Sequence, residues 1–244
     1  MIISFKYKFI FVKNYKTAGS SIETFLYQFL NEKDIIAQTE DTKGINCWGN
    51  FDSKSLIENF EKKFADKYIK NNMAFFAHMP IWLIKERLEV LNKKLNYDFF
   101  KNFYKFAVIR NPFDMLVSDY YWQNNHNNNL KNNNSFKQIL EELKNNNYST
   151  HRLLNLNRIM DKNLKNILCD KVVKYENLNE ELKHVFGHLK IPFNGKLEIF
   201  KKKNLVDKKD QSFYNYESRK LVEKIFYKEI NLFNYKLKEH NSLL

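Results

Sequence analysis

The chain has 244 residues, of which 43% are hydrophobic and 16% aromatic, which is enough for one folded domain with a single core. This composition excludes an intrinsically disordered chain. Because the chain has only two cysteines, a scaffold stabilised by several disulfides is also excluded. The formal net charge of +13 suits a polyanionic partner, although heavy use of Lys and Asn explains part of it. We therefore expect a single domain over residues 1–244.

Predicted strands and helices alternate along the chain, as judged from the spacing of apolar residues. Strands are expected at 5–12, 73–77, 103–110 and 170–174. Helices are expected at 20–31, 53–69, 81–94, 112–123, 135–146, 149–158, 177–189 and 215–231. Apolar strands separated by helices are typical of an α/β fold with a central parallel sheet that helices cover on both sides.

The first strand runs into a polar loop and then a helix, in the sequence FIFVKNYKTAGSSIETFL at 9–26. N–H groups at a helix N-terminus are unpaired, and the helix dipole adds positive charge. Lys16 adds a full charge, and Gly19 allows the backbone to approach a ligand. The predicted phosphate ligands are Lys16, Thr17, Ala18, Gly19, Ser20 and Ser21. The alternative is a polar turn without a ligand.

A second segment, FAVIRNPFDMLVSDYYW at 106–122, repeats this strand-to-helix pattern. Arg110 lies at the C-terminal end of the strand, Pro112 suits the first position of the helix, and Ser118 lies two turns further on. Ligands of open α/β sheets bind at the carboxyl ends of the strands, so Arg110 is expected at the same sheet edge as Lys16. The alternative is a surface arginine beside an ordinary helical serine.

These two segments resemble the nucleotide-binding motifs of the sulfotransferase family. The order K-T-A-G-S-S after a strand is similar to the 5′-phosphosulfate loop of that family, and R-N-P-F-D-x-L-x-S-x-Y-Y is similar to its 3′-phosphate motif. The segment AFFAHMP at 74–80 resembles a strand that ends in G-H-x-P in carbohydrate sulfotransferases, with Ala77 in place of Gly. Weaker likenesses at 172–178 and 211–235 extend the resemblance over most of the chain.

The resemblance implies a P-loop-like three-layer sulfotransferase fold and 3′-phosphoadenosine 5′-phosphosulfate (PAPS) as sulfuryl donor, with no metal required. Lys16 would stabilise charge on the leaving phosphate, and Arg110 with Ser118 would bind the 3′-phosphate. A late loop around 201–210 would close over the nucleotide and contribute Asn204, although its lysines could equally be a solvated charge run. The acceptor would be the hydroxyl of a carbohydrate or glycan.

Two residues are candidates for the base that removes the proton of the acceptor hydroxyl. His78 follows the predicted strand 73–77, and a neutral imidazole accepts protons near physiological pH. Glu23, on the first helix near the loop, is the other candidate. His78 could instead cap a strand, and Glu23 could simply complement the helix dipole.

Two other classes of protein stay open from the sequence. A P-loop kinase would need a lysine after a glycine-rich loop, but here Lys16 precedes the only glycine of the loop. A polyanion-binding or nucleic-acid-binding protein would use the charge of +13, although no recognisable RNA or DNA module is present, and we expect no nucleic-acid partner. His184 and His188 are read as solvated rather than as zinc ligands. No transmembrane segment is predicted. Because the sequence starts at its first predicted strand, we expect a cytoplasmic microbial enzyme or else a trimmed catalytic domain, and we leave open contact with a membrane surface and the oligomeric state.

Overall fold

The structure is a computed structural model that describes residues 1–31, 33–37, 75–126, 136–145, 152–197 and 213–237. The chain forms two compact units, and each is built from two segments of the sequence. The first unit comprises Met1–Ile109 and Asn157–Lys201, and the second comprises Arg110–Leu156 and Lys202–Leu244. The single domain over residues 1–244 therefore stays a prediction.

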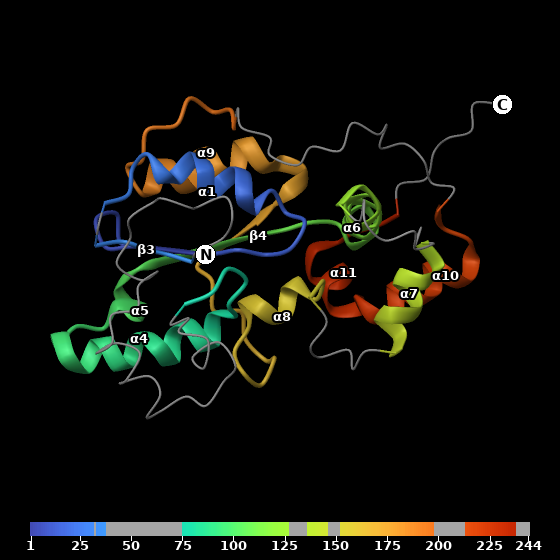
Figure 1. Ribbon diagram of the computed structural model, residues 1–244, viewed down its shortest axis with the longest axis horizontal. Coiled ribbons are helices and arrows are strands. Elements are labelled where there is room, and N and C mark those ends of the chain that lie inside the picture. The colour runs from blue at the N-terminus through green and yellow to red at the C-terminus, as the bar shows by residue number, and fades with distance from the viewer. Residues whose placement is uncertain (32, 38–74, 127–135, 146–151, 198–212, 238–244) are drawn as a thin grey trace. The chain divides into compact units, whose positions relative to one another are not determined.

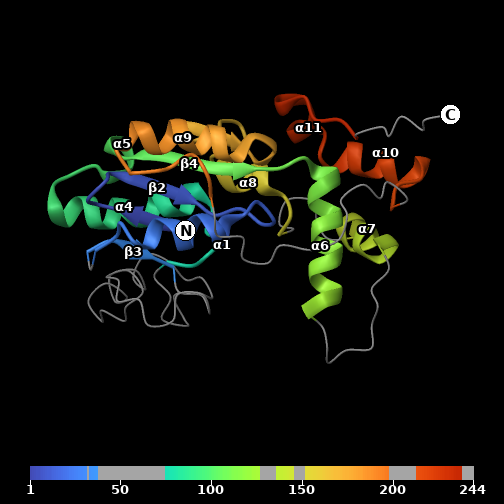
Figure 2. The ribbon, with the colours of Figure 1, turned by 90° about the horizontal axis from the view of Figure 1, so that it is seen from above.

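The first unit contains a five-stranded sheet with the strand order β3-β1-β2-β4-β5. The strands are β1 (Ile2–Ser4), β2 (Phe9–Val12), β3 (Ile35–Ile36), β4 (Tyr104–Ile109) and β5 (Lys171–Lys174). The neighbours β2 and β4 are parallel, as are β4 and β5, whereas β1 is antiparallel to both of its neighbours. Figure 2 shows β2 and β4 side by side. A mostly parallel sheet with flanking helices confirms the predicted fold class.

The predicted first strand over 5–12 is wrong in its extent, because residues 5–8 form the turn of a hairpin between β1 and β2. The buried carboxylate of Asp34 holds this turn. It accepts hydrogen bonds from Phe5 N at 2.6 Å, from Asn31 N at 3.0 Å and from Ser4 Oγ at 3.3 Å. Since these contacts come from a residue far along the chain, the local sequence reads as one continuous strand.

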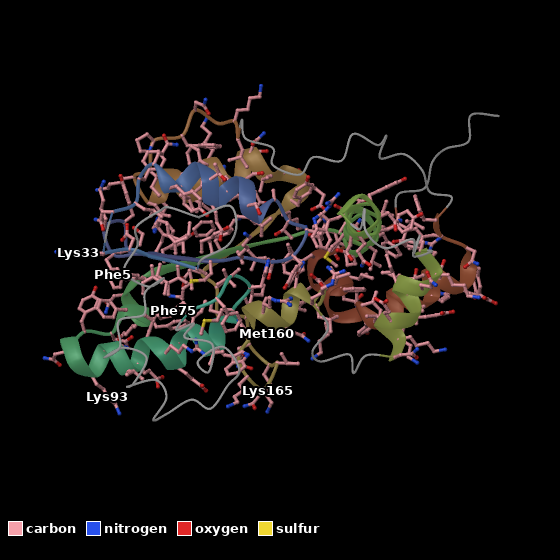
Figure 3. The ribbon with its side chains drawn as sticks, in the orientation of Figure 1. Phe5, Lys33, Phe75, Lys93, Met160 and Lys165 are labelled. Carbon is pink, nitrogen blue, oxygen red and sulfur yellow. The ribbon has the colours of Figure 1, made fainter. Side chains whose placement is uncertain are left out.

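Helices cover both faces of the sheet (Figure 1). On one face lie α1 (Gly19–Tyr27) and α9 (Leu178–His188), and on the other lie α4 (Ile81–Leu95) and α5 (Phe99–Asn102). The α1/α9 side has an aromatic core in which Phe106 stacks on Phe11 at 5.0 Å. On the α4 side, Phe5 meets Phe99 edge to face at 5.1 Å, and Figure 3 shows Phe5 and Phe75 on this side.

The second unit is helical where it is described. Its helices are α6 (Pro112–His126), α7 (Phe136–Asn145), α10 (Tyr216–Ile225) and α11 (Tyr227–Phe233). Phe136 packs against Tyr120, Phe213 and Tyr214. The two terminal guanidinium nitrogens of Arg152 donate to the buried carboxylate of Asp119. These contacts give the unit its own core.

Several predicted elements need correction or lie outside the described residues. The helix expected at 215–231 is two helices, because the backbone at Phe226 leaves the helical conformation. The helix α8 (Asn155–Ile159) is shorter than the one expected at 149–158. Residues 75–77 do not form the end of a strand, and the helix expected at 53–69 lies outside the described residues.

Candidate functional site

The loop between β2 and α1 has an alternating backbone that suits an anion. Lys16 and Ala18 have positive φ values of 59° and 61°, whereas Thr17 between them does not. Successive N–H groups in backbone of alternating hand form concave anion-binding nests. Ala18 is also the N-cap of α1, and its methyl group cannot cap the N–H groups of the first turn. The loop therefore presents N–H groups and the positive end of a helix dipole together.

Non-glycine residues rarely adopt positive φ, because the Cβ atom approaches the backbone. Two such residues within three positions indicate that the surrounding structure holds the loop in a strained shape. Such strain clusters at ligand-binding and catalytic sites. The backbone thus supports the anion-binding role predicted for this loop.

The structure gives the glycine of the loop a packing role besides the predicted approach to a ligand. A Cβ atom at Gly19 would lie 2.7 Å from Cγ of Lys13, so Gly19 provides space for the Lys13 side chain. Lys13 is buried and donates to Oε2 of Glu23, which is fully buried on α1. Glu23 Oε1 also accepts a hydrogen bond from the α-amino group of Met1. A compact ion cluster of Lys13, Glu23 and Met1 therefore lies directly beneath the loop.

The hydroxyl groups of the loop differ in their surroundings. Thr17 is buried, and its Oγ1 donates to the Asn14 carbonyl at 3.3 Å. Ser21 is also buried, whereas Ser20 is half-buried. Because the Thr17 hydroxyl hydrogen is used within the loop, we expect Thr17 to contact an anion through its backbone N–H. Ser20 keeps its role as a predicted hydroxyl donor.

His78 lies in the same unit and packs against this loop. Its ring stacks on Tyr15 with centroids 3.6 Å apart and an interplanar angle of 14°. Its Nδ1 lies 3.1 Å from the carbonyl oxygen of Lys13. A carbonyl oxygen only accepts hydrogen bonds, so Nδ1 carries the hydrogen and Nε2 keeps its lone pair. The structure thus brings His78 to the loop that holds Lys16.

The electrostatic surroundings of His78 keep its imidazole neutral. Burial, together with the positive charges of Lys13 and of the Met1 α-amino group, lowers the pKa of His78 to about 2. The neutral ring can accept a hydrogen bond at Nε2 from a hydroxyl group. Protonating the ring is costly in the ligand-free protein, because the new charge would lie beside existing positive charges.

The predicted residues Arg110 and Ser118 belong to the second unit. Arg110 is buried and directly follows the last residue of β4, and Ser118 is half-buried on α6. Asn111 orders this junction, because its Oδ1 accepts from Phe113 N at 3.2 Å and its Nδ2 donates to the Lys236 carbonyl at 2.8 Å. Pro112 is the first residue of α6, as predicted. Asn204 and the loop 201–210 lie outside the described residues.

Three residues near His78 were missed by sequence reasoning, namely Lys13, Tyr15 and Arg158. The Arg158 guanidinium lies 4.6 Å from the centroid of the Tyr15 ring. The same Tyr15 ring stacks on His78, so Tyr15 lies in contact with both side chains. A lysine directly after an apolar strand was a signal for Lys13. Arg158 comes from a distant part of the chain, and no local pattern marks it.

The chain belongs to the sulfotransferase family, because the model of that family matches residues 1–236. This match spans both compact units, and membership implies that the protein is a transferase. No curated protein and no solved structure is similar enough to count as a relative.

Neither a metal centre nor a membrane-spanning helix is found in the described part of the chain. Among the residues that the structure describes, no group of three or more His, Cys, Asp or Glu side chains could hold a metal ion. None of the described helices combines the length and the apolar character needed to cross a membrane.

Proposed function

We propose that this sulfotransferase transfers the sulfuryl group of PAPS to a hydroxyl group of a carbohydrate acceptor. The observation that carries the proposal is the loop at the end of β2, where positive φ values flank Thr17 and Lys16 lies next to the start of α1. A nest of N–H groups, a lysine and a helix N-terminus fit the 5′-phosphosulfate portion of PAPS. Membership of the sulfotransferase family supports this donor.

The predicted ligands of the two ends of the nucleotide follow adjacent strands. Val12 of β2 pairs in parallel with Ala107 of β4, so both strands leave the sheet at the same edge. Lys16 follows β2 by four residues and Arg110 follows β4 directly. From the resemblance of the two motifs to those of the family, we assign the 5′-phosphosulfate to the Lys16 loop and the 3′-phosphate to Arg110 and Ser118. Asn204 is the proposed contact from the late loop.

Sulfuryl transfer is an in-line displacement, and the protein acts by positioning the groups and stabilising charge. As the sulfur–oxygen bond to the 5′-phosphate breaks, negative charge grows on the bridging oxygen. Lys16 and the N–H groups of the loop would stabilise that charge. In such preorganised sites, removing a single donor typically costs about 100-fold to 1,000-fold in turnover.

His78 is the proposed base, through the lone pair of Nε2. Its hydrogen bond to the Lys13 carbonyl supports the tautomer that this role needs. The low pKa of His78 in the ligand-free protein makes it a weak base there. Anionic groups of a bound donor would oppose the positive charge of Lys13 and raise that pKa. Glu23 is a poorer candidate, because its two oxygens accept from Lys13 and from the Met1 α-amino group.

The carbohydrate acceptor is inferred from the likeness of AFFAHMP to the corresponding segment of carbohydrate sulfotransferases. His78 and Met79 lie in a turn before α4, and the Met79 N–H donates to the Phe76 carbonyl at 3.3 Å. Ala77, in place of the usual Gly, is half-buried in this turn, and its φ is not positive. The substitution therefore needs no unusual backbone at this position.

The experiment is a turnover assay that measures 3′-phosphoadenosine 5′-phosphate released from PAPS with and without a panel of saccharides. We expect release to depend on a saccharide, to fall by about 100-fold or more in Lys16→Ala, and to fall in His78→Ala without loss of nucleotide affinity. Lys33→Ala serves as a matched control, because Lys33 is an exposed lysine near the β-hairpin turn. Saccharide-independent release that survives Lys16→Ala would contradict the proposal.

A further inference from the structure

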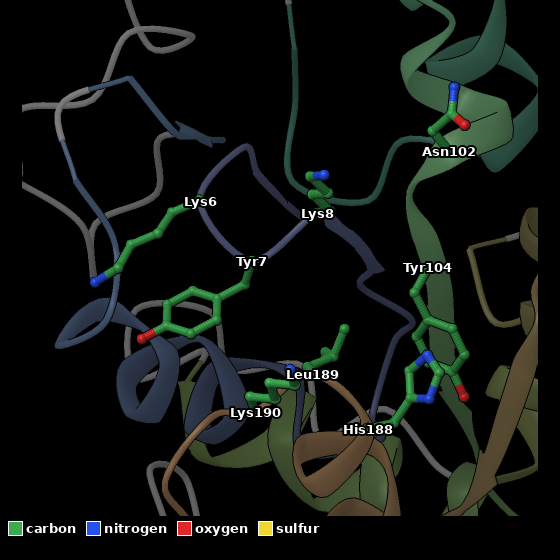
Figure 4. A pocket seen from close by; sticks show the side chains of 8 residues that line it. All are labelled: Lys6, Tyr7, Lys8, Asn102, Tyr104, His188, Leu189 and Lys190. Atoms are coloured by element: carbon green, nitrogen blue, oxygen red, sulfur yellow. The ribbon is translucent and has the colours of Figure 1, made fainter.

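A basic pocket (Figure 4) lies near the starts of β2 and β4, whereas the Lys16 loop follows the end of β2. Lys8 precedes β2 and Tyr104 begins β4, so the pocket is at the N-terminal ends of these two strands. The cavity has a volume of about 430 Å³, within the range of small-molecule sites. Its lining residues are Lys6, Tyr7, Lys8, Asn102, Tyr104, His188, Leu189 and Lys190.

The lining of this pocket carries positive charge. Its lining includes three lysines and no aspartate or glutamate. Lys6 packs over the Tyr7 ring, 4.9 Å from its centroid, and Figure 4 shows Lys8 and Lys190 on different sides of the opening. Among the described ion pairs, none involves Lys8 or Lys190. Such an arrangement attracts an anion.

Two of the three lysines occupy backbone positions that do not favour lysine. Lys8 has φ of 52° in the hairpin turn, and Lys190 has φ of 57° just after the end of α9. The Ile191 N–H donates to the Phe186 carbonyl at 2.8 Å, which is the hydrogen bond of a Schellman motif at the C-terminus of α9. The position of Lys190 in this motif is usually occupied by Gly. Gly or Asn would adopt these conformations at lower cost. The cost at both positions is explained if the ammonium groups bind a ligand.

The remaining walls of the pocket suit a sugar ring. Tyr7 and Tyr104 offer phenol rings and hydroxyl groups, and the Tyr104 ring packs against His188 at 4.4 Å. Burial raises the pKa of Tyr104, so its hydroxyl stays neutral and both donates and accepts hydrogen bonds. Asn102 also lines the pocket, and its Nδ2 donates to the Asp98 carbonyl at 2.7 Å.

We propose that this pocket, formed by Lys8, Tyr104 and Lys190 with their neighbours, binds a sugar ring that carries a sulfate or phosphate ester. The lysines take the tetrahedral oxyanion, and the tyrosine hydroxyls and Asn102 take the sugar hydroxyls. The site is separate from the proposed donor loop, so this proposal does not depend on whether the Lys16 loop binds PAPS.

The test is calorimetric titration of the full chain with glucose 6-sulfate, glucose 6-phosphate, glucose and inorganic sulfate. We expect either or both esters to bind, inorganic sulfate to bind more weakly, and glucose not to bind. Lys190→Gly and Lys8→Asn should each weaken ester binding by about tenfold or more, because each removes one charge-assisted contact. Asn and Gly adopt positive φ at a lower cost than Lys does, so the melting temperature of both variants should stay the same or rise.

Two matched variants distinguish ester binding in this pocket from ester binding elsewhere on the protein. Lys183→Gln removes an exposed lysine of α9 outside the pocket lining and should leave ester binding unchanged. Lys16→Ala should also leave it unchanged. Equal binding of glucose and the esters, retained affinity in both Lys8→Asn and Lys190→Gly, or loss of ester binding in Lys16→Ala would each overturn the proposal.

Discussion

Replacement of Glu23 by Gln tests whether this residue organises the site or removes a proton. Glu23 is fully buried and pairs with Lys13, which is 5% exposed, and with the α-amino group of Met1. Glutamine has nearly the same shape but no charge, so two buried positive groups would lose their counterion. Breaking a buried ion pair typically costs about 3 to 5 kcal/mol in the free energy of unfolding.

This cost would be a large fraction of the stability of a typical domain, about 5 to 15 kcal/mol. Urea unfolding followed by circular dichroism would measure it as a shift of the midpoint. With a urea dependence of about 2 kcal/mol per molar, the expected shift is about 1.5 to 2.5 M. Glu86→Gln is a matched control, because Glu86 pairs at 3.6 Å with the exposed Lys162, and surface pairs contribute about 0 to 1 kcal/mol.

A double-mutant cycle would assign the effect to the ion pair itself. Lys13→Met removes the charge of the partner and keeps much of its apolar stem. The double variant should be more stable than the sum of the two single effects predicts, by about 0.5 to 3 kcal/mol. Unchanged stability in Glu23→Gln combined with a large loss of turnover would refute this reasoning and identify Glu23 as the base.

Three further predictions concern the loop, the hairpin and acid stability. In Gly19→Ala, the new methyl group would push against the stem of Lys13, so we expect a loss of about 1 to 3 kcal/mol in urea unfolding and weaker nucleotide binding; unchanged values for both would show that the loop has room. In Asp34→Ala, the donors of the β1–β2 turn lose a buried acceptor, and thermal unfolding should show that the free energy of unfolding falls by about 1 to 3 kcal/mol. Wild-type stability would mean that the turn does not depend on Asp34. Because the folded-state pKa of His78 is lowered from 6.5 to about 2, the unfolded chain binds a proton below about pH 6.5 that the folded chain does not. The free energy of unfolding should therefore fall as the pH decreases below about 6.5. His78→Gln should reduce this dependence by up to about 1.4 kcal/mol per pH unit. The same pH dependence in both proteins would mean that the His78 ring is exposed to water.

The parts of the fold that the sequence predicted well have local signals. Helices α4, α6 and α9 follow from apolar spacing, and Pro112 marks the start of α6. The β1–β2 hairpin was missed because its turn contains no Gly, Pro or Asn and depends on Asp34. The break at Phe226 was missed because the helical apolar spacing continues through it.

The candidate site also contains residues with a local sequence signal and residues that only tertiary packing brings together. The Lys16 loop was predictable because its residues are contiguous and follow an apolar strand. The ion cluster around Glu23, the stacking of Tyr15 on His78 and the approach of Arg158 all depend on tertiary packing. No pattern of adjacent residues indicates them.

Gly19 has one role that its motif predicts and one that only tertiary packing reveals. A glycine in a phosphate loop suggests backbone approach to a ligand, which stays a prediction, and the structure adds that it makes room for Lys13. The two roles lead to different consequences of substitution, since only the second disturbs the ion cluster on which the loop lies.

The central claim is that the Lys16 loop and the Arg110 segment bind the two ends of a 3′-phosphorylated adenine nucleotide. Calorimetric titration with 3′-phosphoadenosine 5′-phosphate, with AMP and ATP as controls at moderate salt, tests it most directly. We predict tight one-to-one binding that AMP does not reproduce and that Arg110→Ala abolishes. Weak, salt-sensitive binding of all three nucleotides, unchanged in Arg110→Ala, would contradict the claim and favour a general polyanion-binding surface.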